Sequence, residues 1–122
     1  MAQSLEEIKS RIERLKEDAT AVKNQLDQEE TRQQSREIER GAIDSRIDSY
    51  TGDLSHKAFN HMKELKTAQD ENNILCEESD ERVGQLETEL SLLEHEIWAL
   101  EKKIEAEQNR MKLQKDIVNA FD

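Results

Sequence analysis

Apolar residues recur at alternating steps of three and four along two long stretches of the chain. This spacing keeps an apolar stripe on one side of a helix and is typical of coiled coils. The two stretches are near mirror images about Gly52-Asp53, so the chain can fold back with both stripes in contact. The first stripe comprises Leu5, Ile8, Ile12, Leu15, Ala19, Val22 and Leu26, and the second comprises Val83, Leu86, Leu90, Leu93, Ile97, Leu100 and Ile104.

The pattern predicts an all-α fold with a helix over residues 4–50, a turn over 51–55 and a helix over 56–121, in one coiled-coil domain spanning 1–122. Ser4 followed by Glu7 is typical of a capping box at a helix start. Gly52 suits the left-handed residue that ends a helix, and Asp53 or Ser55 suits the cap of the next one. The heptad registers on either side do not join, which favours a turn.

In the predicted antiparallel hairpin, Leu5 lies opposite Leu100 and Leu15 lies opposite Leu90, and the first seam continues to Leu54. Flanking charges then pair as Lys9–Glu101, Lys16–Glu94, Lys23–Glu87, Asp44–Lys66 and Arg11–Glu96. The layers with polar residues in the seam are Gln33–Asn72, Arg36–Gln69, Glu29–Cys76 and Arg40–Leu65. Exposed ion pairs contribute only about 0.2–1 kcal/mol each, so they select a register more than they stabilise it.

The alternative is one continuous helix in a parallel dimeric coiled coil. Val83, Ile97 and Ile104 at the first core position of the heptad are residues that parallel dimers prefer. However, this arrangement places like charges together at Arg11–Lys16 and brings each Glu29 and Arg36 against its own copy. The hairpin is therefore the favoured prediction, and the parallel rod remains the alternative.

The hairpin leaves residues 103–122 as an overhang without a partner inside the chain. This overhang stays amphipathic, and a stripe of apolar and small residues runs along the flank of the second helix. An apolar stripe without an internal partner indicates an external one, and Trp is the residue most enriched in binding hot spots. The predicted partner-binding residues are Leu92, Trp98, Ala99, Ala106, Met111, Leu113, Ile117, Val118 and Phe121.

Composition and charge narrow the classes of function. Charged residues make up 39% of the chain, aromatic residues 3%, and the formal net charge is −11. A surplus of carboxylates disfavours nucleic acid and anionic membranes as partners. The sequence has neither a bilayer-spanning apolar run nor the apolar region of a signal peptide. With Cys76 as its single cysteine, we expect an intracellular protein, cytoplasmic or associated with a cytoskeletal or chromosomal assembly.

The residue types that carry catalysis or bind metals do not form a recognised motif. His95-Glu96 begins a zinc-binding pattern, but Ala99 occupies the place of the second histidine. Cys76 falls at a core position, where it is more typical of packing than of nucleophilic chemistry. We therefore expect no catalytic residue, metal site, cofactor or small-molecule substrate.

The leading hypothesis is a non-enzymatic scaffold or assembly subunit that docks helices of a partner through coiled-coil or bundle packing. Self-association into a dimer or a four-helix bundle uses the same kind of contact. One alternative is a parallel dimeric rod that acts as a spacer. Another is an acidic client-binding or regulatory module that engages a basic protein surface.

Overall fold

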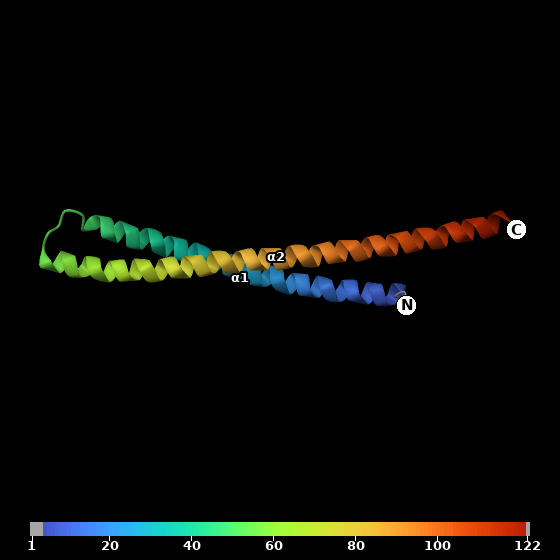
Figure 1. Ribbon diagram of the computed structural model, residues 1–122, viewed down its shortest axis with the longest axis horizontal. Coiled ribbons are helices and arrows are strands. Elements are labelled where there is room, and N and C mark those ends of the chain that lie inside the picture. The colour runs from blue at the N-terminus through green and yellow to red at the C-terminus, as the bar shows by residue number, and fades with distance from the viewer. Residues whose placement is uncertain (1–3, 122) are drawn as a thin grey trace. The chain divides into compact units, whose positions relative to one another are not determined.

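The computed structural model describes residues 4–121 and contains two long helices, α1 (Leu5–Ser49) and α2 (His56–Ala120). The helices pack antiparallel as a helical hairpin and are joined by a short loop (Figure 1). This confirms the predicted all-α hairpin, so the alternative of one continuous helix is wrong. The predicted bounds were residues 4–50 and 56–121. Residues 1–3 and 122 of the predicted domain lie outside the described part of the chain.

Contacts along the hairpin divide it into two compact units, each containing a segment of both helices. The first unit combines residues up to Lys23 with residues from Thr88 onward, and the second unit covers Asn24–Glu87. The heptad pattern within each helix, from which one domain was predicted, crosses the boundary between the units without a shift of register. Each unit is therefore described by its own contacts.

The core of each unit is the seam that the heptads predict. In α1, every predicted seam position from Leu5 to Tyr50 is buried or half-buried, and the same holds in α2 from Ala58 to Ile104. Burying an aliphatic side chain contributes about 1.5–3 kcal/mol, so this narrow stripe holds the hairpin together. Leu54 is the exception, because it lies in the loop and is 98% exposed. Its predicted place in the seam is wrong.

Side chains and one glycine set the ends of the helices. The Ser4 hydroxyl accepts a hydrogen bond from the Glu7 amide at 3.2 Å and begins α1, as predicted. After Ser49, Gly52 has a φ of 87°, the left-handed conformation that glycine adopts without strain. The Ser55 hydroxyl accepts from the Ala58 amide at 3.1 Å and caps α2, while Asp53 Oδ1 accepts from the Ser55 amide at 2.9 Å.

In the first unit, the pairing of the helices differs from the prediction by one heptad. Lys16 Nζ lies 3.8 Å from Glu101 and Lys23 Nζ lies 3.9 Å from Glu94, so the predicted pairs Lys16–Glu94 and Lys23–Glu87 are wrong. Lys9 pairs with Glu6 on its own helix instead of with Glu101. The predicted Arg11–Glu96 pair is confirmed at 2.5 Å.

The polar layers of the second unit show the same displacement. Gln33 Nε2 donates to Asp80 Oδ1 at 2.5 Å, and Arg36 Nη1 donates to the Leu75 carbonyl oxygen at 2.9 Å and to the Ser79 hydroxyl. The predicted layers Gln33–Asn72 and Arg36–Gln69 are therefore wrong. Asp44 accepts from Gln69 instead of pairing with Lys66. Glu29 and Arg40 form ion pairs on their own helix with Arg32 and Glu37, and their facing partners Cys76 and Leu65 stay predictions.

The volumes of the seam residues explain why Arg36 lies where it does. Cys76 and Ser79 are 2% and 0% exposed, and their small side chains leave room for the long Arg36 side chain to cross the seam. Asn72 Nδ2 donates to the Arg36 carbonyl oxygen at 3.3 Å in the same layer. In the predicted register Arg36 would instead have met the larger Gln69.

Candidate functional site

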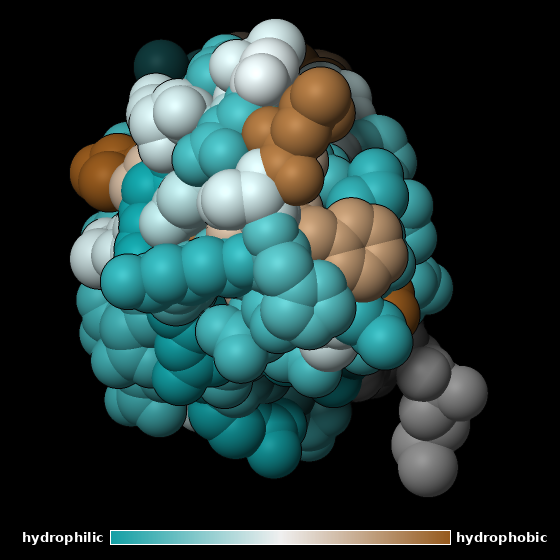
Figure 2. All heavy atoms as spheres, turned by 90° about the vertical axis from the view of Figure 1, so that its left-hand side faces the viewer, coloured by the Kyte–Doolittle hydropathy of each residue, from teal (hydrophilic) through white to brown (hydrophobic). Residues whose placement is uncertain are grey.

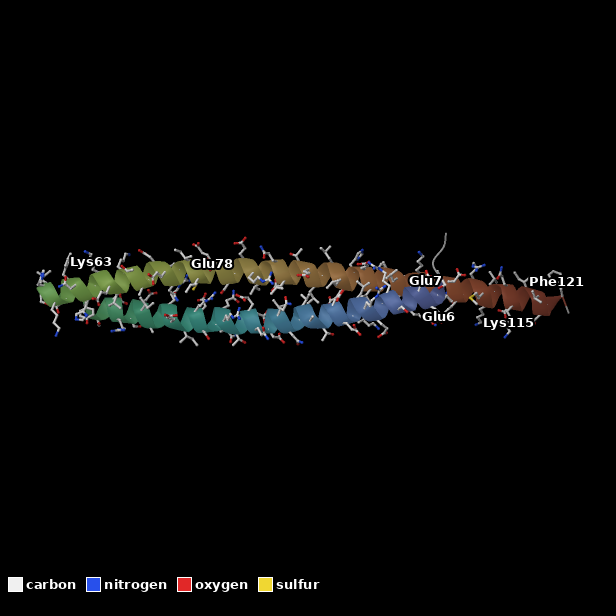
Figure 3. The ribbon with its side chains drawn as sticks, turned by 90° about the horizontal axis from the view of Figure 1, so that it is seen from below. Glu6, Glu7, Lys63, Glu78, Lys115 and Phe121 are labelled. Atoms are coloured by element: carbon white, nitrogen blue, oxygen red, sulfur yellow. The ribbon has the colours of Figure 1, made fainter. Side chains whose placement is uncertain are left out.

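The C-terminal part of α2 is the longest exposed stretch of the first unit. Ile104 and Glu107 are half-buried, whereas every described residue from Gln108 to Phe121 is exposed. The exposed stretch thus begins later than the overhang predicted from residue 103, and Asp122 lies outside the described residues. Figure 3 shows Glu6 and Glu7 in the first turn of α1, and α2 continuing past them to Lys115 and Phe121.

Five large apolar side chains on this stretch are left without a seam partner. Because residues in a helix are about 100° apart, they occupy one broad arc, and Lys112, Lys115 and Asn119 lie on the other side. We call this arc the C-terminal surface. Its residues and their exposed fractions are Met111 50%, Leu113 61%, Ile117 49%, Val118 60% and Phe121 86%.

An open hollow of about 530 Å³ lies where the seam of the first unit ends. Leu5 and Ile8 from α1 line it together with Met111 from α2. Arg110 Nε donates to Glu107 at 3.2 Å at its rim, and this hydrogen bond lowers the pKa of the Glu107 carboxyl. The hollow joins the buried seam to the C-terminal surface, so apolar contact area continues from one to the other.

The rest of the predicted partner-binding set lies nearer the middle of α2. Leu92 is 66% exposed, and Ala99 and Ala106 are also exposed, at heptad spacing on one face of the helix. Trp98 is 55% exposed and lies about 100° around the helix from Ala99. Its ring stacks on His95 of the same helix, with 5.9 Å between the ring centres. Trp98 therefore lies beside the stripe of Leu92, Ala99 and Ala106, and its role in partner binding stays a prediction.

The C-terminal surface differs in charge from the chain that carries it. The whole chain holds 29 acidic and 18 basic residues. Between Gln108 and Phe121, in contrast, Arg110, Lys112 and Lys115 oppose the single carboxylate of Asp116. Among residues 4–121, neither Lys112 nor Lys115 forms an ion pair. Lys112 and Lys115 therefore lie on the side of the helix opposite the C-terminal surface, while Arg110 lies beside the apolar residues and pairs with Glu107.

A second exposed apolar group, which the sequence patterns did not predict, lies at the loop in the second unit. It consists of Tyr50, Leu54, Phe59 and Met62, and we call it the loop-end surface. Phe59 is 65% exposed and directly follows the seam residue Ala58. The sequence did contain a signal for this surface, because Phe59 is an aromatic residue outside the seam and lies close in sequence to three lysines.

In the described part of the chain, no cluster of three or more histidine, cysteine or acidic side chains is arranged to hold a metal ion. The Cys76 thiol is buried and lies 3.6 Å from Asn72 Oδ1. Neither helix, over its described length, is apolar enough to cross a membrane.

The fold and its exposed surfaces define the chain as an all-α helical hairpin. Comparisons with protein-family models, with curated proteins and with solved structures each found no match. The functional argument therefore rests on the surfaces themselves.

Proposed function

We propose that the protein is a non-enzymatic scaffold or assembly subunit that docks a helix of a partner protein on its C-terminal surface. The observation that carries this proposal is the exposure of Met111, Leu113, Ile117, Val118 and Phe121 on one continuous helical arc. Such an arc matches the helix-in-groove and coiled-coil modes of recognition, in which anchors recur every three or four residues.

The hollow beside Met111 supports a definite docking geometry. α1 ends its contact with α2 at Leu5 and Ile8, and the hollow follows directly. A partner helix placed there continues the seam that α1 begins, with its apolar anchors on Met111 and Val118. Aromatic and methionine side chains such as Phe121 and Met111 are enriched at the centres of protein interfaces.

Site-specific photocrosslinking in cells that make the protein tests this docking. A photoreactive amino acid at Ile117 is expected to yield a crosslinked product of defined mass, and the same group at Asn119 on the opposite side is the control. With the photoreactive amino acid kept at position 117, Leu113→Glu combined with Val118→Glu is expected to abolish the product, while Asn119→Glu leaves it unchanged. Equal crosslinking from both positions, or none from either, would contradict the proposal.

Sedimentation of the purified protein identifies the source of the partner. A monomer that forms the Ile117 crosslink only in cells indicates a different protein. A dimer that Ile117→Glu dissociates indicates a second copy of this chain, which is the other form of docking that the surface permits.

A further inference from the structure

The loop-end surface contains two adjoining hollows lined by apolar side chains. Both hollows are open, with volumes of about 530 Å³ and 410 Å³, and Phe59 and Met62 line both of them. Leu54, which lines the larger hollow, is 98% exposed. Figure 2 looks onto this end of the second unit and shows brown and tan apolar side chains among teal polar ones.

Hydrogen bonds and ring stacking hold the loop that carries this surface. The Asp53 amide donates to the Tyr50 carbonyl oxygen at 3.0 Å, and Asp53 Oδ1 accepts from the Ser55 amide. The Tyr50 ring stacks on His61 with 5.7 Å between ring centres and an interplanar angle of 7°. A surface that is ordered before binding loses less conformational entropy when a partner arrives.

Lysines outnumber carboxylates at the start of α2, beside the apolar residues of the smaller hollow. Lys57, Lys63 and Lys66 lie within the first turns of α2, and Glu64 is the one carboxylate between residues 56 and 66. Within residues 4–121, none of these three lysines forms an ion pair, although the chain has a formal net charge of −11. Lys63 and Lys66 also line the smaller hollow, together with the carboxylate of Asp70.

We propose that the loop-end surface binds an acidic amphipathic helix of a partner protein. Apolar side chains of that helix enter the hollows beside Phe59 and Met62, and its carboxylates pair with Lys63 and Lys66. Complementary charge of this kind steers association and selects partners. The contact is separate from the C-terminal surface and does not depend on the function proposed for it.

Two other occupants fit these observations less well. Insertion into a lipid surface would take the Asp53 carboxylate, next to the exposed Leu54, out of water. A second copy placed end to end would bring the same lysines against one another, which costs free energy. An acidic helix requires neither.

Fluorescence anisotropy with the full-length protein tests the proposal. The probe is a labelled synthetic peptide of about four helical turns, with leucines at steps of three and four and glutamates at the other positions. We expect saturable binding that weakens as salt is added. Lys63→Glu combined with Lys66→Glu is expected to raise the Kd by about tenfold or more, and Phe59→Ser to raise it similarly.

The matched control makes the same change of charge at the other end of α2. Lys112→Glu combined with Lys115→Glu is expected to leave the Kd within about twofold. Any binding of a peptide with lysines in place of the glutamates is expected not to weaken in the Lys63→Glu, Lys66→Glu variant. Circular dichroism of each variant verifies the fold, which these exposed substitutions leave intact.

Three results would overturn the proposal. The first is an absence of peptide binding, or an equal loss in both double variants. The second is binding to phosphatidylserine vesicles that Phe59→Ser abolishes while the peptide shows none, which would assign the surface to lipid. The third is a dimer of the protein alone that Phe59→Ser dissociates, which would assign the surface to a second copy.

Discussion

Two leucines in the second unit show how strongly the contribution of a side chain depends on its place in the heptad. Leu86 is 1% exposed in the seam, whereas Leu54 is 98% exposed in the loop. Each loses the same atoms when it is replaced by alanine. Only Leu86 leaves a cavity, since Leu54 is already in water.

Leu86→Ala is therefore expected to lower the free energy of unfolding by about 3 kcal/mol, from lost burial and an unfilled cavity. Leu54→Ala is its matched control and is expected to change that free energy by less than about 0.5 kcal/mol. Urea unfolding followed by circular dichroism measures both. Similar losses in the two variants would show that Leu54 packs in the folded protein.

Arg36 contributes through hydrogen bonds instead of apolar area. Its guanidinium donates to the Leu75 carbonyl oxygen and to the Ser79 hydroxyl. Arg36→Ala leaves these acceptors without their charged donor and is expected to cost about 1–3 kcal/mol in the same urea experiment. Arg14→Ala on the exposed side of α1 is the control, with an expected change below about 0.5 kcal/mol. If Arg36→Ala left the urea midpoint of unfolding unchanged, water would replace these hydrogen bonds without loss of free energy of unfolding.

The loop before α2 is stabilised by the Asp53 carboxylate, which accepts a hydrogen bond from the Ser55 amide. The hydrogen bond from the Ser55 amide lowers the pKa of the Asp53 carboxyl below its ordinary value of 3.8. The unfolded chain therefore binds this proton more readily than the folded protein does. The stability that Asp53 contributes is fully present above pH 3.8 and is lost as the pH falls through the lower folded value.

Asp53→Asn removes this pH dependence while keeping an oxygen that accepts the hydrogen bond. The variant is expected to be less stable than the native protein near neutral pH, and the difference is expected to shrink as acid protonates Asp53. Thermal unfolding of both proteins at a series of pH values measures the difference. A difference that stays constant down to about pH 2 would contradict the role of the Asp53 charge.

Both helices and their seam follow from the heptads because burial and spacing are local properties of the sequence. The register does not, because Glu87, Glu94 and Glu101 are themselves one heptad apart. Lys16 and Lys23 therefore find a glutamate in either register, and the flanking charges that predicted the pairing do not discriminate between the two. The sequence did not predict the loop-end surface, because Phe59 lies outside the heptad repeat. Only the folded loop brings Phe59 beside Tyr50 and Leu54.

For the molecule as a whole, the register determines which cysteines can be joined. With Cys76→Ser as background, Leu15→Cys is expected to form a disulfide with Ile97→Cys, since Lys16–Glu101 and Arg11–Glu96 bracket this pair in the first unit. The pair Leu15→Cys and Leu90→Cys, which belongs to the register one heptad away, is the control and is expected to close poorly. Electrophoresis under denaturing conditions distinguishes the compact monomer from crosslinked dimers. Efficient closure of the control pair would contradict the observed register.

The layer formed by Arg36, Asn72 and Ser79 has one more consequence. Two helices with strictly repeating apolar stripes can pair in more than one register. When one helix slides past the other by one heptad, equivalent side chains meet again. This layer contains an arginine at a seam position that donates to the other helix beside the two small buried residues Cys76 and Ser79, so it differs from the layers of leucine and isoleucine. The layer therefore favours one register among those that the leucines and isoleucines alone would allow. Within the second unit, a few polar atoms thus select one alignment of two helices that the apolar residues alone would let slide.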